Sequence, residues 1–413
     1  MNQLTTQKHS AFNLTVFVAA LGYFVDIYDL QLFNLVGKKS LGAAGLGLSP
    51  EMVNHYFDVV LFNWQMAGML LGGIIWGILG DLKGRKSILF GSILLYSIAN
   101  IANGFVTTTD QYIVVRFIAG LGLAGELGAA LTLVSEIMTK ENRGYGTMLI
   151  VTVGALGAVV AYFLSKVVSW QWSYFIGGGL GVLLLVMRMT TFESGMFDQL
   201  KKQHVSRGNF ISLFTNRTRF LTFLKCILIG VPVWYCIGVL MKFSVSFAAS
   251  IGVTGTIEVP KAIMFSYIGL SVGDLLSGYL SQIFKSRKKI VIGYLLASMI
   301  ITLIYLFSKN ISANYFYTLC FFVGCATGYW ALFVTIASEQ FGTNIRATVT
   351  TTVPNFVRGF VIPLTLGFNF LQTGEGAINA ALIIGGASFL LAFISILTVK
   401  ETFGKDLNYL EMS

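Results

Sequence analysis

The stretch SEIMTKENR (Ser135–Arg143) shows how this chain is organised, because the second half of the sequence repeats its pattern as SEQFGTNIR (Ser338–Arg346). Both stretches read Ser-Glu, six residues, Arg, and each follows the fourth long apolar run of its half. A second echo closes the halves, with FESGMF (Phe192–Phe197) in the first and KETFGKDL (Lys400–Leu407) in the second. We infer that the chain is duplicated and that its halves are parallel repeats.

The composition indicates a polytopic membrane protein. Hydrophobic residues make up 55% of the chain and charged residues only 11%, whereas soluble domains average about 25% charged residues. The net charge of +10 does not predict nucleic-acid binding, because membrane proteins collect Lys and Arg in their cytoplasmic loops. The three histidines are scattered and the four cysteines fall inside apolar runs, so neither set predicts a metal or redox site.

Twelve apolar runs are long enough to cross a bilayer, which takes about 20 residues. Spans of this kind are helical, because lipid leaves every backbone polar group to be paired internally. We therefore predict an all-α membrane protein with twelve transmembrane helices in two pseudo-symmetric six-helix bundles. The predicted limits are 12–35, 56–79, 87–107, 111–137, 146–166, 170–190, 220–247, 262–283, 289–308, 313–338, 347–371 and 377–399.

The basic residues predict that both termini are cytoplasmic. Few lie in the outer loops: Lys38, Lys39, Lys166, Lys261 and Lys309. The inner loops hold many more: Lys83, Arg85, Lys86, Lys140, Arg143, Lys201, Lys202, Arg207, Arg217, Arg219, Lys285, Arg287, Lys288 and Lys289. The predicted domains are an N-terminal bundle (1–190), a cytoplasmic linker (191–219), a C-terminal bundle (220–399) and a cytoplasmic tail (400–413). Compact loops favour a bacterial inner membrane.

Two motifs resemble a known family. GILGDLKGRKS (Gly77–Ser87) matches the loop between helices 2 and 3 of the major facilitator superfamily, and RFIAGLGLAGELG (Arg116–Gly128) resembles its helix 4. With the repeated Glu and Arg and the KETFGKDL tail, the whole chain is similar to the sugar-porter and metabolite–proton symporter branches. The resemblance implies a charged network that closes the inner side, while a solvated basic loop is the alternative. The gating candidates are Asp81, Gly84, Arg85, Glu136, Arg143, Glu339 and Arg346.

Some features depart from these patterns or exclude other functions. Gln282 stands where Asp81 stands in the first half, and helix 5 lacks the Gly-Pro pair of drug–proton antiporters. GLGLAG (Gly120–Gly125) fits a dinucleotide fingerprint, but it lies inside a membrane helix, where glycines favour close helix packing. Because no nucleophile–base set or cofactor motif is present, we predict that the protein is not an enzyme and needs no cofactor.

Charged residues inside the spans of the first half need a reason, because each costs at least ~2.5–3.5 kcal/mol at the bilayer centre. Asp26 and Asp29 share one face of helix 1, and Arg116 and Glu126 lie in helix 4. Arg116 and Asp29 lie at similar depth, so they form either a structural ion pair or a proton relay. In a relay, an Arg that moves on or off a carboxylate changes its proton affinity. We predict proton coupling by Asp26 or Asp29 with Arg116, and by Glu126 as the alternative.

The second half places Asp274 and Arg358 level with each other near the midplane. They form either a structural pair or, if Arg358 is freed, a site for an anionic or acidic-sugar substrate. Because acids outnumber bases at mid-depth, a neutral or cationic substrate is the alternative. Polar and aromatic residues at similar depth complete a candidate substrate pocket, although ordinary helix packing is the alternative for each. These residues are Asn63, Gln65, Trp234, Tyr235, Tyr329, Trp330 and Asn355.

Together these features predict a secondary active transporter that moves a small polar metabolite, an organic anion or a sugar-like molecule, by alternating access with proton symport. An exporter or uncoupled facilitator of the same fold is the first alternative, and a transporter-like sensor is another. The expected partners are the substrate, protons and the lipid bilayer, with no nucleic acid. We expect the protein to be a monomer.

Overall fold

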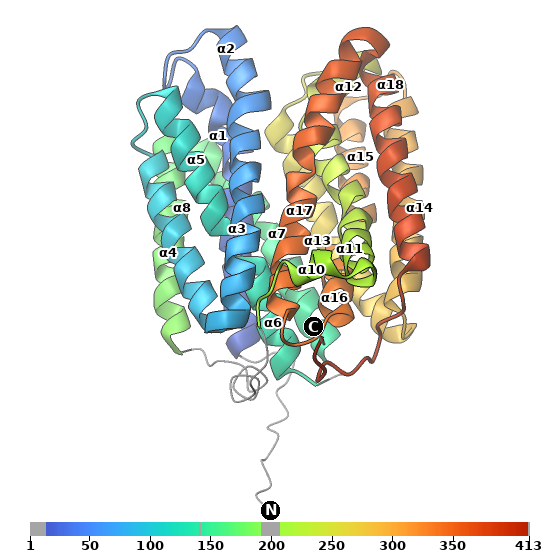
Figure 1. The fold of residues 1–413 in the computed structure, drawn as a ribbon. Helices are drawn as coiled ribbons and strands as arrows, with labels where there is room; N and C mark the ends of the chain where they lie inside the picture. Colours follow the sequence, from blue (N-terminus) through green and yellow to red (C-terminus); the bar gives the residue numbers. More distant parts are fainter. Residues whose placement is uncertain (1–13, 140–141, 191–206, 412–413) are drawn as a thin grey trace, which may run out of the picture.

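The computed structural model describes residues 14–139, 142–190 and 207–411. This part of the chain is helical, apart from loops and one isolated β-bridge between Thr254 and Ser312. Its helices run side by side in two groups that follow the two halves of the sequence (Figure 1). The prediction of an all-α membrane fold is therefore confirmed.

The first half contains six spans, two of which are interrupted. The second span has three parts, because a π-helical turn, η1, joins α2 to α3, and the fourth span breaks between α5 and α6. A short 3-10 turn, η2 (Arg188–Thr190), follows the sixth span. The elements are α1 (Leu14–Leu41), α2 (Pro50–His55), η1 (Tyr56–Val60), α3 (Leu61–Lys83), α4 (Arg85–Asn103), α5 (Thr109–Leu123), α6 (Glu126–Ile137), α7 (Arg143–Val167) and α8 (Trp170–Met187).

The second half repeats this plan after a short helix, α10, in the predicted linker. A second π-helical turn, η3, lies in the seventh span, and the tenth span breaks between α15 and α16. The elements are α10 (Ser212–Thr215), α11 (Arg217–Tyr235), η3 (Cys236–Met241), α12 (Ser244–Ser250), α13 (Val259–Ile283), α14 (Arg287–Phe307), α15 (Ala313–Ala326), α16 (Trp330–Gln340), α17 (Arg346–Gly359) and α18 (Val361–Thr398).

Twelve spans result, as the sequence predicts. Ten stretches of the described chain are long and apolar enough to cross a membrane. The last of them, Arg346–Thr398, holds two spans, because the helix is interrupted at Gly376, whose φ of 78° and ψ of 162° are non-helical. The remaining span, the third along the chain, is α4, which packs against α5 and α8.

Several spans begin at side chains that cap them. The hydroxyl of Ser169 accepts a hydrogen bond from the N–H of Trp172 at the start of α8, and Ser286 accepts one from Lys289 at the start of α14. Such caps pair the N–H groups that the first turn of a helix leaves free.

Glycines bring neighbouring spans into backbone contact. A Cβ added to Gly68 on α3 would collide with the carbonyl of Phe117 on α5, and one on Gly120 would collide with the carbonyl of Gln65. The second half repeats this between α13 and α15, where a Cβ on Gly269 would meet the Phe321 carbonyl. The GLGLAG stretch therefore serves close helix packing, as the sequence analysis favoured.

The halves meet along three main pairs of helices. α3 packs against α17, α7 against α13, and α6 against α17. Figure 1 shows α3 and α17 side by side, with the C-terminus below them and α2 at the other end. We call the end that holds residues 400–411 the tail end, and the opposite end the α2 end.

Candidate functional site

A small space lies between the two halves. Its empty volume is about 280 Å³, and the part that water can enter is too small for a substrate. The halves must therefore separate before a metabolite can bind here. Four of the ten lining side chains are aromatic, and the lining residues are Tyr23, Ile27, Val151, Ala155, Val233, Trp234, Ile237, Tyr267, Leu270 and Trp330. Of the predicted pocket residues, Trp234 and Trp330 line this space.

Arg358 on α17 reaches across the interface to α1. Its Nη2 lies 3.6 Å from Oδ2 of Asp26 and 3.4 Å from Oη of Tyr23, and all three side chains are buried. Charge-assisted N–H···O hydrogen bonds are usually about 2.7–2.9 Å long, so this ion pair is loose. Nε of Arg358 and both oxygens of Asp26 have no hydrogen-bond partner within the described ranges. The guanidinium therefore keeps donors that a second carboxylate could use.

Aromatic rings connect Arg358 to the central space. The Trp330 ring centroid is 5.8 Å from Cζ of Arg358 and 6.3 Å from the ring centroid of Trp234. On the other side, Tyr267 accepts a hydrogen bond of 2.7 Å from Nε2 of Gln31, which joins α13 to α1. An anion at Arg358 would thus have an aromatic wall beside it.

The expected pair between Asp274 and Arg358 is not formed. Asp274 instead accepts a 3.0 Å hydrogen bond from the N–H of Ala331, in the first turn of α16. The break between α15 and α16 leaves the N–H groups of that turn without helical partners, and they attract the carboxylate. The pair was predicted because Asp274 and Arg358 lie at similar depth, but depth does not show that these N–H groups compete for the carboxylate.

The expected ion pair between Arg116 and Asp29 is also not formed. Arg116 donates to Oε1 of Gln65, and its Cζ lies 5.0 Å from the ring centroid of Phe33. Asp29 is fully buried and faces α8, where a Cβ added to Gly177 would collide with its Oδ1. The two side chains lie at similar depth but have different surroundings, so Asp29 stays a candidate for proton coupling without this partner.

Glu126, the other proton-coupling candidate, forms an ion pair with Arg188 of η2. Both side chains are buried, and Gly22 on α1 makes room for them, because a Cβ there would collide with both. Arg188 was not predicted from the sequence. The sequence feature that could have revealed it is the position of a basic residue inside the predicted limits of the sixth span.

Two predicted pocket tyrosines hold helices together instead of facing the space. Oη of Tyr235 donates a 2.8 Å hydrogen bond to the carbonyl of Ala381, and Oη of Tyr329 donates a 3.0 Å bond to the carbonyl of Ile229. For these two residues, helix packing is therefore the better interpretation.

Asn355 performs a related task at the break in the fourth span. Its Nδ2 donates a 2.8 Å hydrogen bond to the carbonyl of Ala124, where α5 stops, and its Oδ1 lies 3.4 Å from Nη1 of Arg358. One amide thus links the broken helix of the first half to the arginine of the second.

At the tail end, Glu136 binds one arginine from each half. Its Oε1 is 2.8 Å from Nη2 of Arg85 in the first half and 3.4 Å from Nη1 of Arg346 in the second. The Arg85 and Arg346 side chains are fully buried. The sequence-predicted residues therefore meet across the interface.

Glu339 forms the matching set in the second half. Its carboxylate is 3.0 Å from Nε of Arg143 in the first half and 3.0 Å from Nε of Arg287 in its own half. The two sets are related by the internal repeat. Arg287 was predicted from the sequence only as a basic loop residue, although KSRK (Lys285–Lys288) repeats the pattern of KGRK (Lys83–Lys86).

Asp81 and Gly84 complete the tail-end contacts of the first half. Asp81 crosses the interface to the start of α17, where its oxygens accept hydrogen bonds of 3.1 Å from the N–H of Ala347 and 2.8 Å from that of Thr348. Gly84 joins α3 to α4 with φ 99° and ψ 157°, a combination open almost only to glycine.

The C-terminal tail covers these contacts. Nη2 of Arg143 donates a 2.6 Å hydrogen bond to the carbonyl of Lys405, and Nη2 of Arg346 donates to the carbonyl of Leu407. The tail therefore supplies main-chain acceptors to both sets of arginines.

Glu401 anchors the tail to the start of α14. Partial burial alone would raise the pKa of its carboxyl, but hydrogen bonds from the Ser286 hydroxyl and the N–H groups of Phe403, Arg287 and Thr402 outweigh this and lower the pKa. A lowered pKa means that this anchor is complete at neutral pH and weakens as the pH falls through the acidic range.

The α2 end also carries contacts between the halves. Lys242, which is 3% exposed, donates a 2.7 Å hydrogen bond to the carbonyl of Asp58 and lies 4.0 Å from the ring centroid of Phe62. The predicted pocket residue Asn63 lies at this interface too, where its Oδ1 is 3.5 Å from Oγ1 of Thr365. Contacts at both ends close the central space.

The described ranges contain no cluster of three His, Cys, Asp or Glu side chains that could hold a metal ion. Comparison with known proteins gives a match to the Major Facilitator Superfamily over residues 11–365. A Bacillus subtilis protein whose name proposes niacin/nicotinamide transport is 27% identical, with 93% of this chain and 95% of that protein covered. The sialic acid transporter NanX of Escherichia coli is 25% identical over 74% of each chain.

Solved structures share the fold. The proton:xylose symporter XylE superposes with a TM-score of 0.72 at 17% identity, covering 95% of this chain and 97% of that one. The E. coli fucose:proton symporter FucP gives a TM-score of 0.74 at 14% identity, with coverage of 95% and 100%.

Proposed function

The chain belongs to the Major Facilitator Superfamily, and we propose that it is a proton-coupled symporter for a small organic anion. Membership and the transporter relatives support metabolite transport across a membrane. The observation that carries the finer proposal is the loose, buried pair of Arg358 and Asp26 beside the central space.

The pair suggests how an anion and a proton would move together. A substrate carboxylate has the planar geometry that suits the guanidinium of Arg358. When it replaces Asp26 there, Asp26 loses its counter-charge in a buried environment and takes up a proton, because an isolated buried carboxylate is costly. The site holds one positive and one negative charge before and after the exchange, so binding one anion with one proton leaves its net charge unchanged.

The surroundings of Arg358 support a carboxylate on a ring. Four aromatic side chains line the space next to it, and flat apolar walls with few polar groups are common in small-molecule sites. The name of one relative, the sialic acid transporter, points the same way, because sialic acid carries a carboxylate on a ring. The name of the other covers both an acid, niacin, and its neutral amide, nicotinamide. We therefore favour an organic acid over a neutral sugar.

Alternating access would use the contacts at the two ends in turn. At the tail end, Glu136 and Glu339 each bind two arginines, one from the first half and one from the second. At the α2 end, Lys242 and Asn63 make the crossing contacts. Rocking of the halves would break one group while the other persists. We propose that the tail end faces the cytoplasm and that the membrane is a bacterial inner membrane; the excess of basic residues in the loops at the tail end supports this orientation.

A thermal-shift panel tests the substrate class. Purified protein is mixed with nicotinate or benzoate, and with the neutral amide of each acid as the matched ligand control. A ligand that binds only the folded state stabilises it, so we expect the acids to raise the melting temperature and the amides not to. Arg358→Gln should erase this difference, at a loss of about 1.5–3 kcal/mol in binding, the usual value of hydrogen bonds to charged groups.

Arg116→Gln serves as the matched protein control, because Arg116 is also a buried arginine but contacts Gln65 and Phe33. It should keep the preference for acids. Uptake of the stabilising acid into proteoliposomes then tests coupling, and an imposed proton gradient should drive accumulation. Uptake that ignores the gradient would contradict symport, and equal shifts with acid and amide would contradict an anion site.

A further inference from the structure

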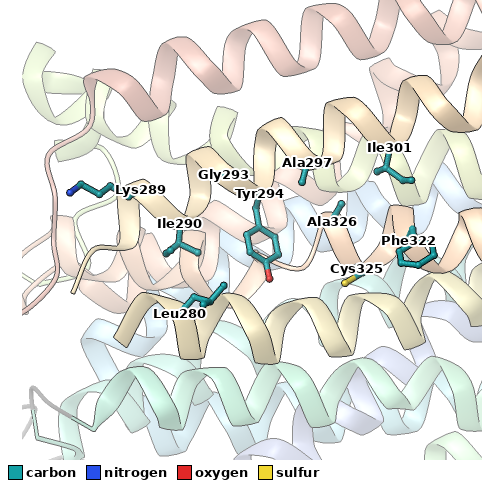
Figure 2. Close-up of a pocket in the computed structure, with 10 residues that line it drawn as sticks. All are labelled: Leu280, Lys289, Ile290, Gly293, Tyr294, Ala297, Ile301, Phe322, Cys325 and Ala326. Atoms are coloured by element: carbon teal, nitrogen blue, oxygen red, sulfur yellow. The ribbon is translucent and has the colours of Figure 1, made fainter. Parts of the chain in front are cut away.

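An apolar groove runs along the outer face of the second half. α13, α14 and α15 form it, and its empty volume is about 880 Å³. Figure 2 shows the α14 side chains in a row from Lys289 to Ile301, with Leu280 of α13 and Phe322 of α15 on the flanks. The groove exists because small residues hollow the surface of α14, and a Cβ at Gly293 would meet no atom within 4 Å.

This groove faces the membrane and is separate from the central space. Its residues belong only to the second half, and Phe322 is 49% exposed at its rim. Since these helices span a bilayer, hydrocarbon chains are what surrounds such a face. The occupant must therefore be apolar along most of its length.

The tail end of the groove carries a positive charge. Lys289 is exposed, and its Nζ has no hydrogen bond or ion pair within the part of the chain that the structure describes. Its neighbour Lys288 differs, because its Nζ donates to the carbonyls of Leu397 and Val399. A free ammonium at one end of an apolar groove complements a molecule with an acidic head and a hydrocarbon tail.

We propose that this groove binds one anionic phospholipid, with its phosphate at Lys289 and an acyl chain along Gly293, Ala297 and Ile301. Basic residues at the end of a groove between transmembrane helices attract acidic lipid headgroups. The acyl chain fills the hollow at Gly293, so the site requires both features.

A second groove provides an internal comparison. It lies between α14 and α18, has an empty volume of about 670 Å³, and is lined by apolar residues that include Leu303, Gly386 and Phe389. Among the described residues, no lysine or arginine lines it. It therefore accepts acyl chains without selecting the headgroup.

Native mass spectrometry of the full chain tests the proposal. Delipidated protein is titrated with phosphatidylglycerol or with phosphatidylcholine of the same acyl chains, and bound lipids are counted. We expect one phosphatidylglycerol to bind more tightly than phosphatidylcholine. Lys289→Ala should weaken phosphatidylglycerol binding about five-fold, the factor that corresponds to ~1 kcal/mol for one basic residue near the membrane surface, and leave phosphatidylcholine binding unchanged.

Two matched controls separate this site from general lipid binding. Gly293→Leu should fold, because no atom lies within 4 Å of a Cβ added there, and it should weaken the binding of both lipids at this site. Gly386→Leu fills the comparison groove and should keep the preference for phosphatidylglycerol. Lys285→Ala removes a neighbouring charge outside the groove and should have little effect. The proposal is overturned if Lys285→Ala and Lys289→Ala weaken binding equally, if Gly293→Leu binds like the native protein, or if native protein binds both lipids alike.

Discussion

Replacing Asp26 with asparagine removes the charge that faces Arg358 and keeps the shape of the side chain. At the N–O distance of 3.6 Å, an effective dielectric constant of about 20 gives an attraction of roughly 5 kcal/mol between the two charges. A substrate anion must compete with this attraction in the native protein but not in Asp26→Asn. If only about a third of this attraction, ~1.4 kcal/mol, opposes binding, its removal makes the affinity tenfold higher. We therefore expect Asp26→Asn to bind the anion at least tenfold more tightly than the native protein at pH 8.

The pH dependence of binding gives a sharper test of the same variant. If Asp26 takes up one proton when the anion binds, the native Kd rises about tenfold for each pH unit above the pH at which Asp26 ionises in the free protein. Asp26→Asn has no carboxyl group there, so its Kd should be flat over the same range. Titration calorimetry with the panel acid that gives the largest thermal shift measures both profiles.

Asp29→Asn tests the other helix 1 carboxyl that was predicted to couple protons, because Asp29 is equally buried on the same helix but faces Gly177 of α8. It should keep the native slope. A native slope in Asp26→Asn would refute the exchange of partners on Arg358. In proteoliposomes, Asp26→Asn should still exchange labelled for unlabelled anion but lose accumulation driven by a proton gradient.

Three further predictions concern the contacts around the site. Gly84→Ala should lower the free energy of unfolding by about 1–3 kcal/mol in thermal denaturation, because its backbone conformation is strained for alanine, whereas an unchanged melting temperature would contradict this. Glu339→Gln should weaken tail-end closure by about 3–5 kcal/mol. Thr335 on α16 is buried, and its hydroxyl lies 3.3 Å from that of Thr147 across the interface, so a membrane-impermeant thiol reagent should label Thr335→Cys at least tenfold faster from that side, and an unchanged rate would count against a gate. Asp274→Ala should cost about 0.5–2 kcal/mol of stability, because the first turn of α16 loses its cap, and it should leave the affinity for the anion unaltered. A loss of affinity would instead support the pairing of Asp274 with Arg358 that was predicted from the sequence.

Much of the fold and many of the tail-end contacts could be predicted from the sequence. Apolar length marks the spans, and the repeated Ser-Glu and Arg stretches placed Glu136 and Glu339 at equivalent helix ends. Duplication explains why this works, since each motif has a partner at the same place in the other half. Arg287 was missed because the motif around it is less complete than the one around Arg85.

The pairings in the core were not predictable from depth alone. Depth along a straight helix says how far a residue lies from the membrane surface, but it does not say which neighbour its side chain faces. Asp274 was matched with Arg358 by depth, yet the break before α16 offers it free N–H groups. Arg358 instead crosses to Asp26 in the other half, a pairing that depends on how the bundles meet.

Counting protons during binding tests the central claim most directly. Calorimetric titration of the native protein with the stabilising acid, in buffers of different ionisation enthalpy, gives the number of protons taken up per anion. The exchange of Asp26 for substrate on Arg358 predicts a value close to one at a pH where Asp26 is ionised in the free protein. The exchange would be contradicted if the acid binds without proton uptake at every pH tested.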